Sequence, residues 1–212
     1  MGMNDDLVRN LMREGIIRSR DVERAMLSVD RSYFVPGRFR REAYFDHPLQ
    51  IGEGQTISAP HMVAIMAEEL LVHEGHRVLE VGGGSGYHAA VIAKMVGSTG
   101  HVYTVERIPS LVKWGRENLI RAGIDNVTFI EGDGSTGYPE GSPYDRIYYT
   151  CAAPNIPQVV IDQLTDGGII LGIVGPKHGV QRLMRYIKIG NRIEKEGLTR
   201  CVFVPLIGEM GY

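Results

Sequence analysis

Cysteine is scarce in this sequence: Cys151 and Cys201 are the only two among 212 residues, and no CxxC pair occurs. The seven histidines are scattered, and none belongs to an HxxxH or HExxH motif. Two cysteines without a paired motif and isolated histidines do not make a metal cage, so we expect no metal. The same cysteine usage is typical of a reducing compartment, and we expect a cytoplasmic protein.

Long apolar runs and an excess of one charge are also missing. No run approaches the roughly 20 residues that span a bilayer, and residues 1–6 lack the apolar region of a secretory signal. The formal net charge is -2, which provides no global field to hold nucleic acid or an anionic membrane. Glycine and proline recur at no fixed period, which excludes repeat architectures. We therefore expect a monomer that binds neither nucleic acid nor membranes.

What the sequence does contain is a globular composition, 43% hydrophobic and 23% charged, over a length suited to one domain. In its central part, short apolar or β-branched runs alternate with helical segments. The runs lie at residues 77–81, 101–106, 126–131, 145–150 and 168–174, and the helical segments lie at 86–96, 108–122 and 157–164. This alternation predicts an α/β protein with a doubly wound, mostly parallel, Rossmann-like sheet.

The two ends of the chain follow other patterns. Apolar spacing predicts helices over residues 5–14 and 20–29 and another from Ala59, with a long irregular stretch at 36–57. After Gly175, strand-like runs without intervening helices predict an antiparallel C-terminal edge; these runs are residues 183–189, 192–198 and 201–207.

We accordingly expect one domain over residues 1–212. Its three parts are an N-terminal helical cap with a substrate loop (about 1–75), a cofactor-binding α/β core (about 76–175) and a C-terminal β edge (about 176–212). In open α/β sheets, ligands bind beyond the carboxyl ends of the strands. We therefore expect the N-terminal helices and the loop to cover that edge of the sheet.

The strongest local signal is the segment VLEVGGGSG, residues 78–86. A buried strand that runs into a glycine-rich turn and a helix brings backbone N–H groups close to a ligand. Glu106 ends the next strand, 20 residues after Gly86, where its carboxylate can accept both hydroxyls of a ribose. The pair favours a nucleoside cofactor. The structural alternatives are tight strand–helix packing for the glycines and a solvated strand end for Glu106.

Two nucleoside cofactors fit this pattern. Gly84, Gly86 and Ala89 match the G-x-G-x-x-A form of the dinucleotide fingerprint. An NAD-dependent reductase is therefore a competing interpretation, although the chain contains no Tyr-x-x-x-Lys pair to supply a proton.

The GxGxG spacing that begins at Gly82 instead resembles motif I of the S-adenosylmethionine-dependent methyltransferases. That resemblance places Glu80 near the methionine amino group and Glu106 at the ribose. It also places Asp133, in the turn at residues 131–134, near the adenine amine. Three acids at three successive strand ends fit this cofactor better than NAD. For Asp133 alone, an ordinary turn residue before glycine is the alternative.

Longer segments resemble one family of these enzymes, the protein-L-isoaspartate O-methyltransferases, over nearly the whole chain. Besides the glycine motif, the matching segments are IIRSRDVERAML (16–27), GQTISAPHM (54–62), GDGSTGYP (132–139), AAPNIP (152–157) and FVPLIG (203–208). Two places depart from the family's pattern. Gly83 stands where threonine is usual, and GIVG (172–175) stands where a Pro-Val-Gly run is usual. Both changes concern loop rigidity more than the type of reaction.

The resemblance implies methyl transfer from S-adenosyl-L-methionine to the free carboxylate of L-isoaspartyl residues, with S-adenosyl-L-homocysteine as product. The ester re-forms a succinimide that hydrolyses in part to normal aspartate, so the implied role is protein repair, and the implied partners are isoaspartyl proteins and peptides. The implied cofactor-binding residues are Thr56, Ile57, Glu80, Gly82, Gly84, Gly86, Glu106, Asp133 and Gly134. The implied substrate-binding residues are Ser58, Ala59 and Val204, with Ser58 catalytic.

Ser58 suits the chemistry of that reaction. A carboxylate acceptor with a pKa of about 4 is already ionised at neutral pH, so no general base is required. The site needs donors that hold and aim the carboxylate, which the Ser58 hydroxyl and N–H groups at the start of the next helix could supply. However, a serine just before a helix is also an ordinary N-cap. Val204 likewise either pairs with an extended peptide or belongs to a plain edge strand.

Two further interpretations stay open on the sequence alone. A small-molecule methyltransferase would have a more enclosed acceptor pocket, and a sensor would bind the cofactor without turnover. Two other residues near the motifs have structural explanations as well: His61 lines the site or touches ligand, and Cys151 is best explained as a small packing residue.

Overall fold

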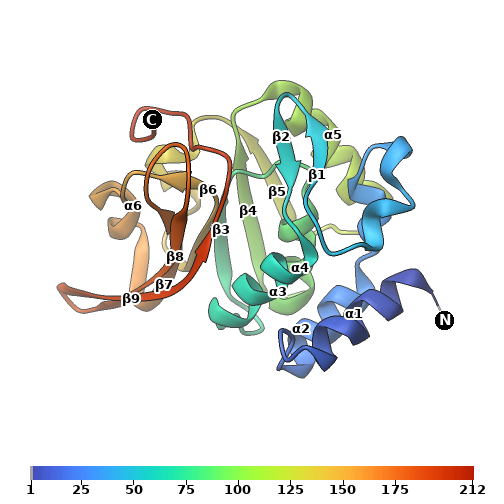
Figure 1. The fold of residues 1–212 in the computed structure, drawn as a ribbon. Helices are drawn as coiled ribbons and strands as arrows, with labels where there is room; N and C mark the ends of the chain where they lie inside the picture. The colour runs from blue at the N-terminus through green and yellow to red at the C-terminus, as the bar shows by residue number, and fades with distance from the viewer. Residues whose placement is uncertain (1) are drawn as a thin grey trace.

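The computed structural model describes residues 2–212, built around one large sheet with helices on both faces (Figure 1). The α-helices are α1 (Met3–Arg13), α2 (Arg20–Ser28), α3 (Pro60–Glu69), α4 (Tyr87–Val96), α5 (Pro109–Arg121) and α6 (Gln158–Asp162). The strands are β1 (Leu49–Gly52), β2 (Gln55–Ile57), β3 (Arg77–Val81), β4 (His101–Glu106), β5 (Val127–Glu131), β6 (Tyr144–Ala153), β7 (Leu164–Val174), β8 (Gln181–Ile189) and β9 (Arg192–Cys201). Short 3-10 turns are η1 (Arg31–Phe34), η2 (Gly37–Phe39), η3 (Glu42–Tyr44), η4 (Gly134–Thr136) and η5 (Pro139–Gly141).

The large sheet has the strand order β5-β4-β3-β6-β7-β8-β9. Strands β5 to β7 run parallel to one another, whereas β8 pairs antiparallel with both of its neighbours. The predicted doubly wound sheet with an antiparallel C-terminal edge is confirmed. Because the strand order reverses between β3 and β6, the carboxyl ends of these two strands form the crevice in which such folds bind ligands.

The sheet divides the apolar core into two layers. On β3, Val78 belongs to the larger layer, which includes buried side chains from α1 to α5, whereas Leu79 and Val81 belong to the layer on the opposite face. That second face is covered by α6, which Figure 1 shows on the other side of the sheet from α4 and α5. Burial on both faces explains why the central strands read as continuous apolar runs instead of alternating with polar residues.

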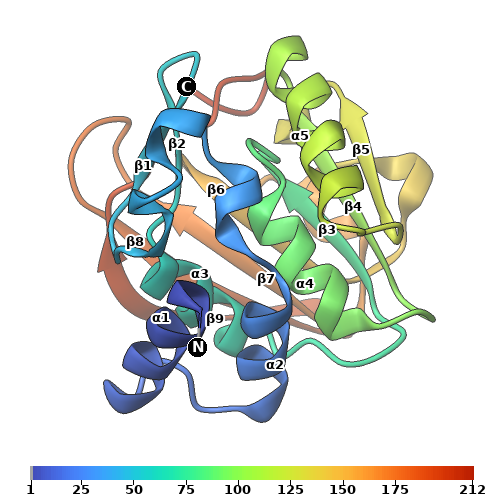
Figure 2. The same ribbon diagram turned by 90° about the vertical axis from the view of Figure 1, so that its right-hand side faces the viewer.

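The N-terminal helices pack on other helices. The start of α2 is fixed by Glu68 of α3, whose carboxylate accepts hydrogen bonds from the backbone N–H groups of Arg18 and Ser19, both at 2.8 Å. Helix α2 packs on α3 and α4, and α1 packs on α2 and on η3. Both helices lie at the opposite end of the molecule from the β1–β2 hairpin (Figure 2). The expectation that these helices cover the carboxyl edge of the sheet is therefore wrong, because α2 is buried against α3 and α4, and α1 against α2 and η3.

Two segments differ from the sequence-based expectation. Residues 36–57, expected to be irregular, contain the β1–β2 hairpin, whose strands are too short for their periodicity to show. Residues 201–207, expected to be a third C-terminal strand, leave the sheet after Cys201 and make one isolated bridge between Pro205 and Ala152. Proline has no N–H to donate to a ladder, so this segment cannot extend the sheet as a regular strand.

Candidate active site

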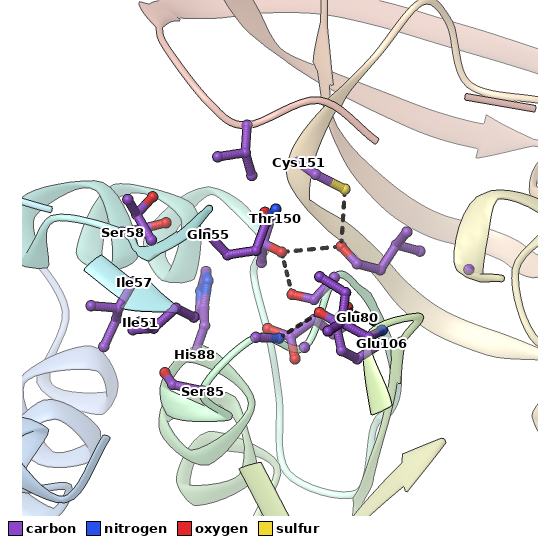
Figure 3. A pocket seen from close by; sticks show the side chains of 18 of the residues that line it. Ile51, Gln55, Ile57, Ser58, Glu80, Ser85, His88, Glu106, Thr150 and Cys151 are labelled. Carbon is purple, nitrogen blue, oxygen red and sulfur yellow. Dashed lines mark hydrogen bonds between the residues drawn. The ribbon is translucent and has the colours of Figure 1, made fainter. Parts of the chain in front are cut away.

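A cavity lies at the carboxyl ends of β3, β4 and β6, beneath the β1–β2 hairpin and the segment 204–207 (Figure 3). Its volume is about 890 Å³, including space continuous with solvent, which lies within the range of small-molecule sites. The predicted site residues that line it are Thr56, Ile57, Ser58, Glu80, Gly82, Gly84, Glu106, Gly134 and Val204. Ala59, Gly86 and Asp133 lie outside this lining.

The glycine loop after β3 leaves no room for side chains. Gly82 has a φ of +96°, and a Cβ added there would lie 2.5 Å from the Thr150 hydroxyl at the end of β6. The same hydroxyl donates hydrogen bonds to the carbonyl groups of Val81, at 3.1 Å, and of Gly82. Gly84 also has a positive φ, of +51°. The loop is therefore held close against β6, and Gly82 and Gly84 line the cavity, where glycine lets the backbone approach a ligand closely.

Glu106 is held in place at the end of β4. One of its carboxylate oxygens accepts the N–H of Gly84 and the other accepts the N–H of Ile108, both at 3.0 Å. The side chain is only 7% exposed and lines the cavity. A carboxylate fixed by backbone donors on each oxygen keeps free lone pairs for further donors, and the two hydroxyls of a ribose are such donors.

Glu80 lies one strand away and is fully buried. Its carboxylate accepts hydrogen bonds from the hydroxyls of Thr104 and Tyr148, the latter at 2.9 Å. Burial raises the pKa of Glu80 to about 8, with a further contribution from nearby Glu106, although the two hydroxyl donors oppose the shift. A cationic group in the cavity would stabilise the ionised form. The position therefore suits an ammonium or sulfonium ligand.

Ser58 lies between β2 and α3. The N-cap of α3 is Ala59, and no side chain caps this helix. The interpretation of Ser58 as an ordinary helix cap is thus wrong, and Ser58 lies at the cavity wall on the side of β2 and α3 (Figure 3). Close by, the carboxylate of Asp46 accepts hydrogen bonds from His61, from its backbone N–H at 2.8 Å and its ring Nδ1 at 2.9 Å. This pair fixes the first turn of α3 and hence the approach of the chain to Ser58.

Asp133 contacts the C-terminal segment. Its carboxylate accepts the N–H of Ser135 at 2.9 Å and the N–H of Glu209 at 2.7 Å. These donors hold the pKa of the Asp133 carboxyl below its usual range, although partial burial acts in the opposite direction. Its neighbour Gly134 lines the cavity, so the turn lies at the cavity while the Asp133 side chain holds the chain end. A contact of Asp133 with the adenine amine stays a prediction.

Val204 uses one backbone group within the protein and leaves the other available. Its carbonyl accepts the N–H of Ala152 at 2.8 Å, and Leu206 donates to the Ala152 carbonyl at 2.7 Å. Within residues 2–212, no acceptor lies in hydrogen-bond range of the Val204 N–H. The segment is therefore paired to the end of β6 on one side while its other side borders the cavity.

Sequence reasoning passed over several lining residues, Thr150 and His88 foremost. Thr150 is the last residue of the predicted strand 145–150, which ends at the same edge as the strands of Glu80 and Glu106, and that position was a usable signal. His88, in the first turn of α4, gave no pattern that separates it from a core histidine. No group of three or more potential metal ligands occurs in the part of the chain that the structure describes. Among the same residues, no helix is long and apolar enough to cross a bilayer.

Comparison with known proteins gives one consistent result. The sequence model of the family "Protein-L-isoaspartate(D-aspartate) O-methyltransferase" matches residues 2–211. The protein-L-isoaspartate O-methyltransferases of Hyperthermus butylicus and Methanococcus maripaludis are 54% and 50% identical to this chain. Each alignment covers 97% of this chain, and the two cover 89% and 96% of the relatives respectively.

Solved structures agree. A chain assigned as a protein-L-isoaspartate O-methyltransferase from Plasmodium falciparum, crystallised with S-adenosyl-L-homocysteine, matches with a TM-score of 0.85 and 30% identity. The match covers 98% of this chain and 99% of that chain. Another protein-L-isoaspartate O-methyltransferase matches with a TM-score of 0.88 and 31% identity, covering 98% of this chain and 67% of that one. Nothing in these comparisons favours a reductase. The chain belongs to the protein-L-isoaspartate(D-aspartate) O-methyltransferase family.

Proposed function

We propose that this chain uses S-adenosyl-L-methionine to methylate the free carboxylate of L-isoaspartyl residues in damaged proteins and peptides. The observation that supports this most directly is a single cavity that contains both the acid pair Glu80 and Glu106 and the hydroxyl of Ser58. The acids suit a cationic nucleoside, and Ser58 suits a carboxylate. A site with both features joins a methyl donor to an acidic acceptor.

The residues around the cavity fit the cofactor. The glycine loop lines the cavity and packs so closely on β6 that a Cβ at Gly82 would meet the Thr150 hydroxyl, and Glu106 presents a fixed carboxylate for ribose hydroxyls. Glu80 has a buried carboxylate whose ionised form a nearby cation would stabilise. When bound, the cofactor supplies an electrophilic methyl group on a sulfonium cation, whose transfer to a carboxylate oxygen cancels two opposite charges.

The protein's part in the reaction is to position and desolvate the acceptor. The isoaspartyl carboxylate is ionised at neutral pH, so no residue has to remove a proton. Ser58 donates a hydrogen bond that aims one carboxylate oxygen, and the Val204 N–H is available to the peptide backbone. Ile51 and Ile57 of the hairpin lie over the cavity and exclude water. Orientation of this kind contributes roughly 7–11 kcal/mol in favourable systems.

The later reactions of the methyl ester do not require the enzyme. The methoxy group of an ester is a better leaving group than the oxygen of a carboxylate. The main-chain amide nitrogen therefore attacks the ester carbonyl carbon, methanol leaves, and the succinimide re-forms. Part of the succinimide hydrolyses to normal aspartate. Methylation of the isoaspartyl carboxylate thereby begins the repair of the damaged residue.

The test is methyl transfer from labelled S-adenosyl-L-methionine to a peptide that contains isoaspartate, beside the same peptide with normal aspartate. We expect label on the isoaspartyl peptide alone, together with S-adenosyl-L-homocysteine in equal amount. Equal labelling of both peptides would overturn the specificity. Tight cofactor binding with label on neither peptide would overturn the substrate and leave the cofactor assignment standing.

A further inference from the structure

His88 is a buried polar side chain whose hydrogen-bonding groups are not used. It lies in the first turn of α4, is 7% exposed and lines the cavity beside Glu80 and Ser58 (Figure 3). Neither ring nitrogen has a hydrogen-bond partner among residues 2–212. Burial lowers the pKa of His88 to about 3, so the imidazole is neutral at physiological pH, with one N–H donor and one bare nitrogen. Leaving such groups unpaired is costly, and proteins generally do so only where a ligand or water completes the bonds.

His88 lies close to Glu80, the acid that suits a cation, because both residues contact Tyr148. Its ring centroid lies 4.6 Å from that of Tyr148, and the Tyr148 hydroxyl donates to the Glu80 carboxylate at 2.9 Å. An acceptor for a cation and a free N–H donor thus both contact one tyrosine side chain. An amino acid end group, with its ammonium and its carboxylate on one carbon, presents the complementary pair of charges.

The wall that carries His88 also favours a negative charge. It is the N-terminal turn of α4, where the helix dipole is positive. The preceding residue, Tyr87, lines the same cavity, and the Arg31 guanidinium lies 5.0 Å from its ring centroid. Arg31 is fully buried, and its side-chain nitrogens have no hydrogen-bond partner in the described part of the chain. Burial lowers the pKa of Arg31 to about 10, which still leaves it cationic at neutral pH.

We propose that His88 is a cofactor-binding residue that donates its ring N–H to the carboxylate of the methionine moiety, while Glu80 accepts the ammonium group of the same moiety. Arg31 supports this subsite from behind Tyr87 as a positioning charge. The proposal rests on the proposed cofactor site. It assigns the carboxylate of the cofactor's methionine moiety to His88 and the ammonium group to Glu80. It explains why a neutral histidine with unsatisfied nitrogens is buried at this point.

The test compares three ligands that differ only at the amino acid end. S-adenosyl-L-homocysteine has both charged groups, its decarboxylated analogue keeps the amine, and 5′-methylthioadenosine has neither. Calorimetric titration of His88→Leu should show S-adenosyl-L-homocysteine bound about ten- to a hundred-fold more weakly than by the native protein, the usual loss for a hydrogen bond to a charged group. The other two ligands should change by less than about threefold, because they contribute no carboxylate.

Two variants serve as controls. His88→Gln retains an N–H donor and should keep most of the affinity for S-adenosyl-L-homocysteine. Glu80→Gln should weaken S-adenosyl-L-homocysteine and the decarboxylated analogue alike and spare 5′-methylthioadenosine. Equal weakening of all three ligands by His88→Leu would show a packing role and overturn the proposal, as would unchanged binding of S-adenosyl-L-homocysteine.

A measurement on the native protein covers the case in which His88→Leu does not fold. In proton NMR, the ring N–H of His88 should become a slowly exchanging, downfield signal in the complex with S-adenosyl-L-homocysteine. The signal should be absent with the decarboxylated analogue. The same signal with both ligands would overturn the role of the carboxylate. Failure of all three ligands to bind would instead contradict the cofactor site itself.

Discussion

Ser58 lies where the chain passes from β2 into α3, and its hydroxyl faces the cavity instead of capping the helix. We predict that Ser58→Ala lowers kcat/KM for an isoaspartyl peptide by about ten- to a hundred-fold, since a hydrogen bond to a charged group contributes roughly 1.5–3 kcal/mol. The dissociation constant of S-adenosyl-L-homocysteine should stay unchanged. Steady-state assays and calorimetry measure the two quantities, and a loss of activity below about threefold would contradict the role of Ser58.

Glu80 makes cofactor affinity depend on pH. Its pKa in the folded protein is about 8, against a usual value of 4.5, so below pH 8 most molecules hold a proton that an incoming cation must displace. Binding of S-adenosyl-L-methionine should therefore tighten about tenfold between pH 6.5 and 8. Glu80→Gln should remove this dependence and weaken binding at pH 8. Calorimetry between pH 6.5 and 8 measures the dissociation constant of S-adenosyl-L-methionine. A constant that does not change with pH in the native protein would contradict the prediction.

The same group affects stability with a definite sign. Between its unfolded and folded pKa values, native Glu80 holds a proton that the unfolded chain has lost. Stability therefore falls as pH rises from about 4.5 to about 8. A buried carboxyl that costs stability near neutral pH is consistent with a role in binding.

Gly83 is the position at which this chain departs from the threonine expected in its family. A Cβ there would lie 2.5 Å from the Thr104 hydroxyl and 2.7 Å from the Phe129 ring. We predict that Gly83→Thr destabilises the protein by about 1–3 kcal/mol, as overpacking of a filled core does. In the background of Phe129→Leu the same change should cost less, because only the Thr104 hydroxyl still opposes the new Cβ. Urea denaturation of the native protein, the two single variants and the double variant gives the coupling free energy between positions 83 and 129. Additive effects on the free energy of unfolding would contradict a clash between the two side chains.

At the scale of elements, the β1–β2 hairpin is a cover for the cavity. Its tip, Gly52, Glu53 and Gly54, has positive φ at three successive residues, which turns the hairpin back sharply. The Glu53 carboxylate accepts the hydroxyl of Ser110, in the first turn of α5, at 2.8 Å. One side chain contact therefore joins the tip of the cover to the helix across the cavity mouth.

This contact predicts a change in cofactor release. Ser110→Ala removes it without altering the backbone of the hairpin, and should raise the dissociation rate of S-adenosyl-L-homocysteine about two- to tenfold, the range for a single exposed hydrogen bond. Stopped-flow displacement measures this rate. As a matched control, Ser142→Ala removes an exposed serine hydroxyl bond in the loop before β6 and should leave the rate unchanged. Equal rates in native protein and Ser110→Ala would show that the hairpin opens independently of α5.

At the scale of the whole molecule, distant parts of the chain meet at one cavity: the hairpin, the glycine loop and the segment 204–207. Binding of S-adenosyl-L-homocysteine at about 100 times its dissociation constant should add about 2.7 kcal/mol to stability and raise Tm by roughly 5–10 °C. Hydrogen exchange should slow at residues 51–58 and 204–207 and stay the same in α6 and in the β8–β9 hairpin. Protection confined to the glycine loop would contradict a cavity closed from both sides.

The fold could be predicted from the sequence where local pattern and tertiary burial agree. The central strands are apolar because both faces are buried, and the same burial makes them recognisable. The predicted strand at 201–207 is wrong because the chain leaves the sheet after Cys201 and pairs again only at Pro205, a residue whose missing N–H prevents pairing on both sides; that signal the sequence does carry.

The site was predictable only in part. Glu80, Glu106 and Ser58 belong to motifs that are recognisable in the sequence. His88 and Thr150 matter because of neighbours that are distant in sequence, such as Tyr148 and the carbonyl of Gly82. No periodicity reports contacts of that kind.

Phe129 has a consequence for how such a sequence can change over time. Its ring lies against glycines from three places: Gly83 in the cofactor loop, Gly86 at the start of α4 and Gly115 within α5. A side chain at position 83 needs room from this ring and from the Thr104 hydroxyl together, so a smaller residue at position 129 removes only one of the two obstacles. Which residues the cofactor loop can accept is therefore coupled to positions outside it, and substitutions at 83, 86 and 115 all depend on the size of the side chain at 129.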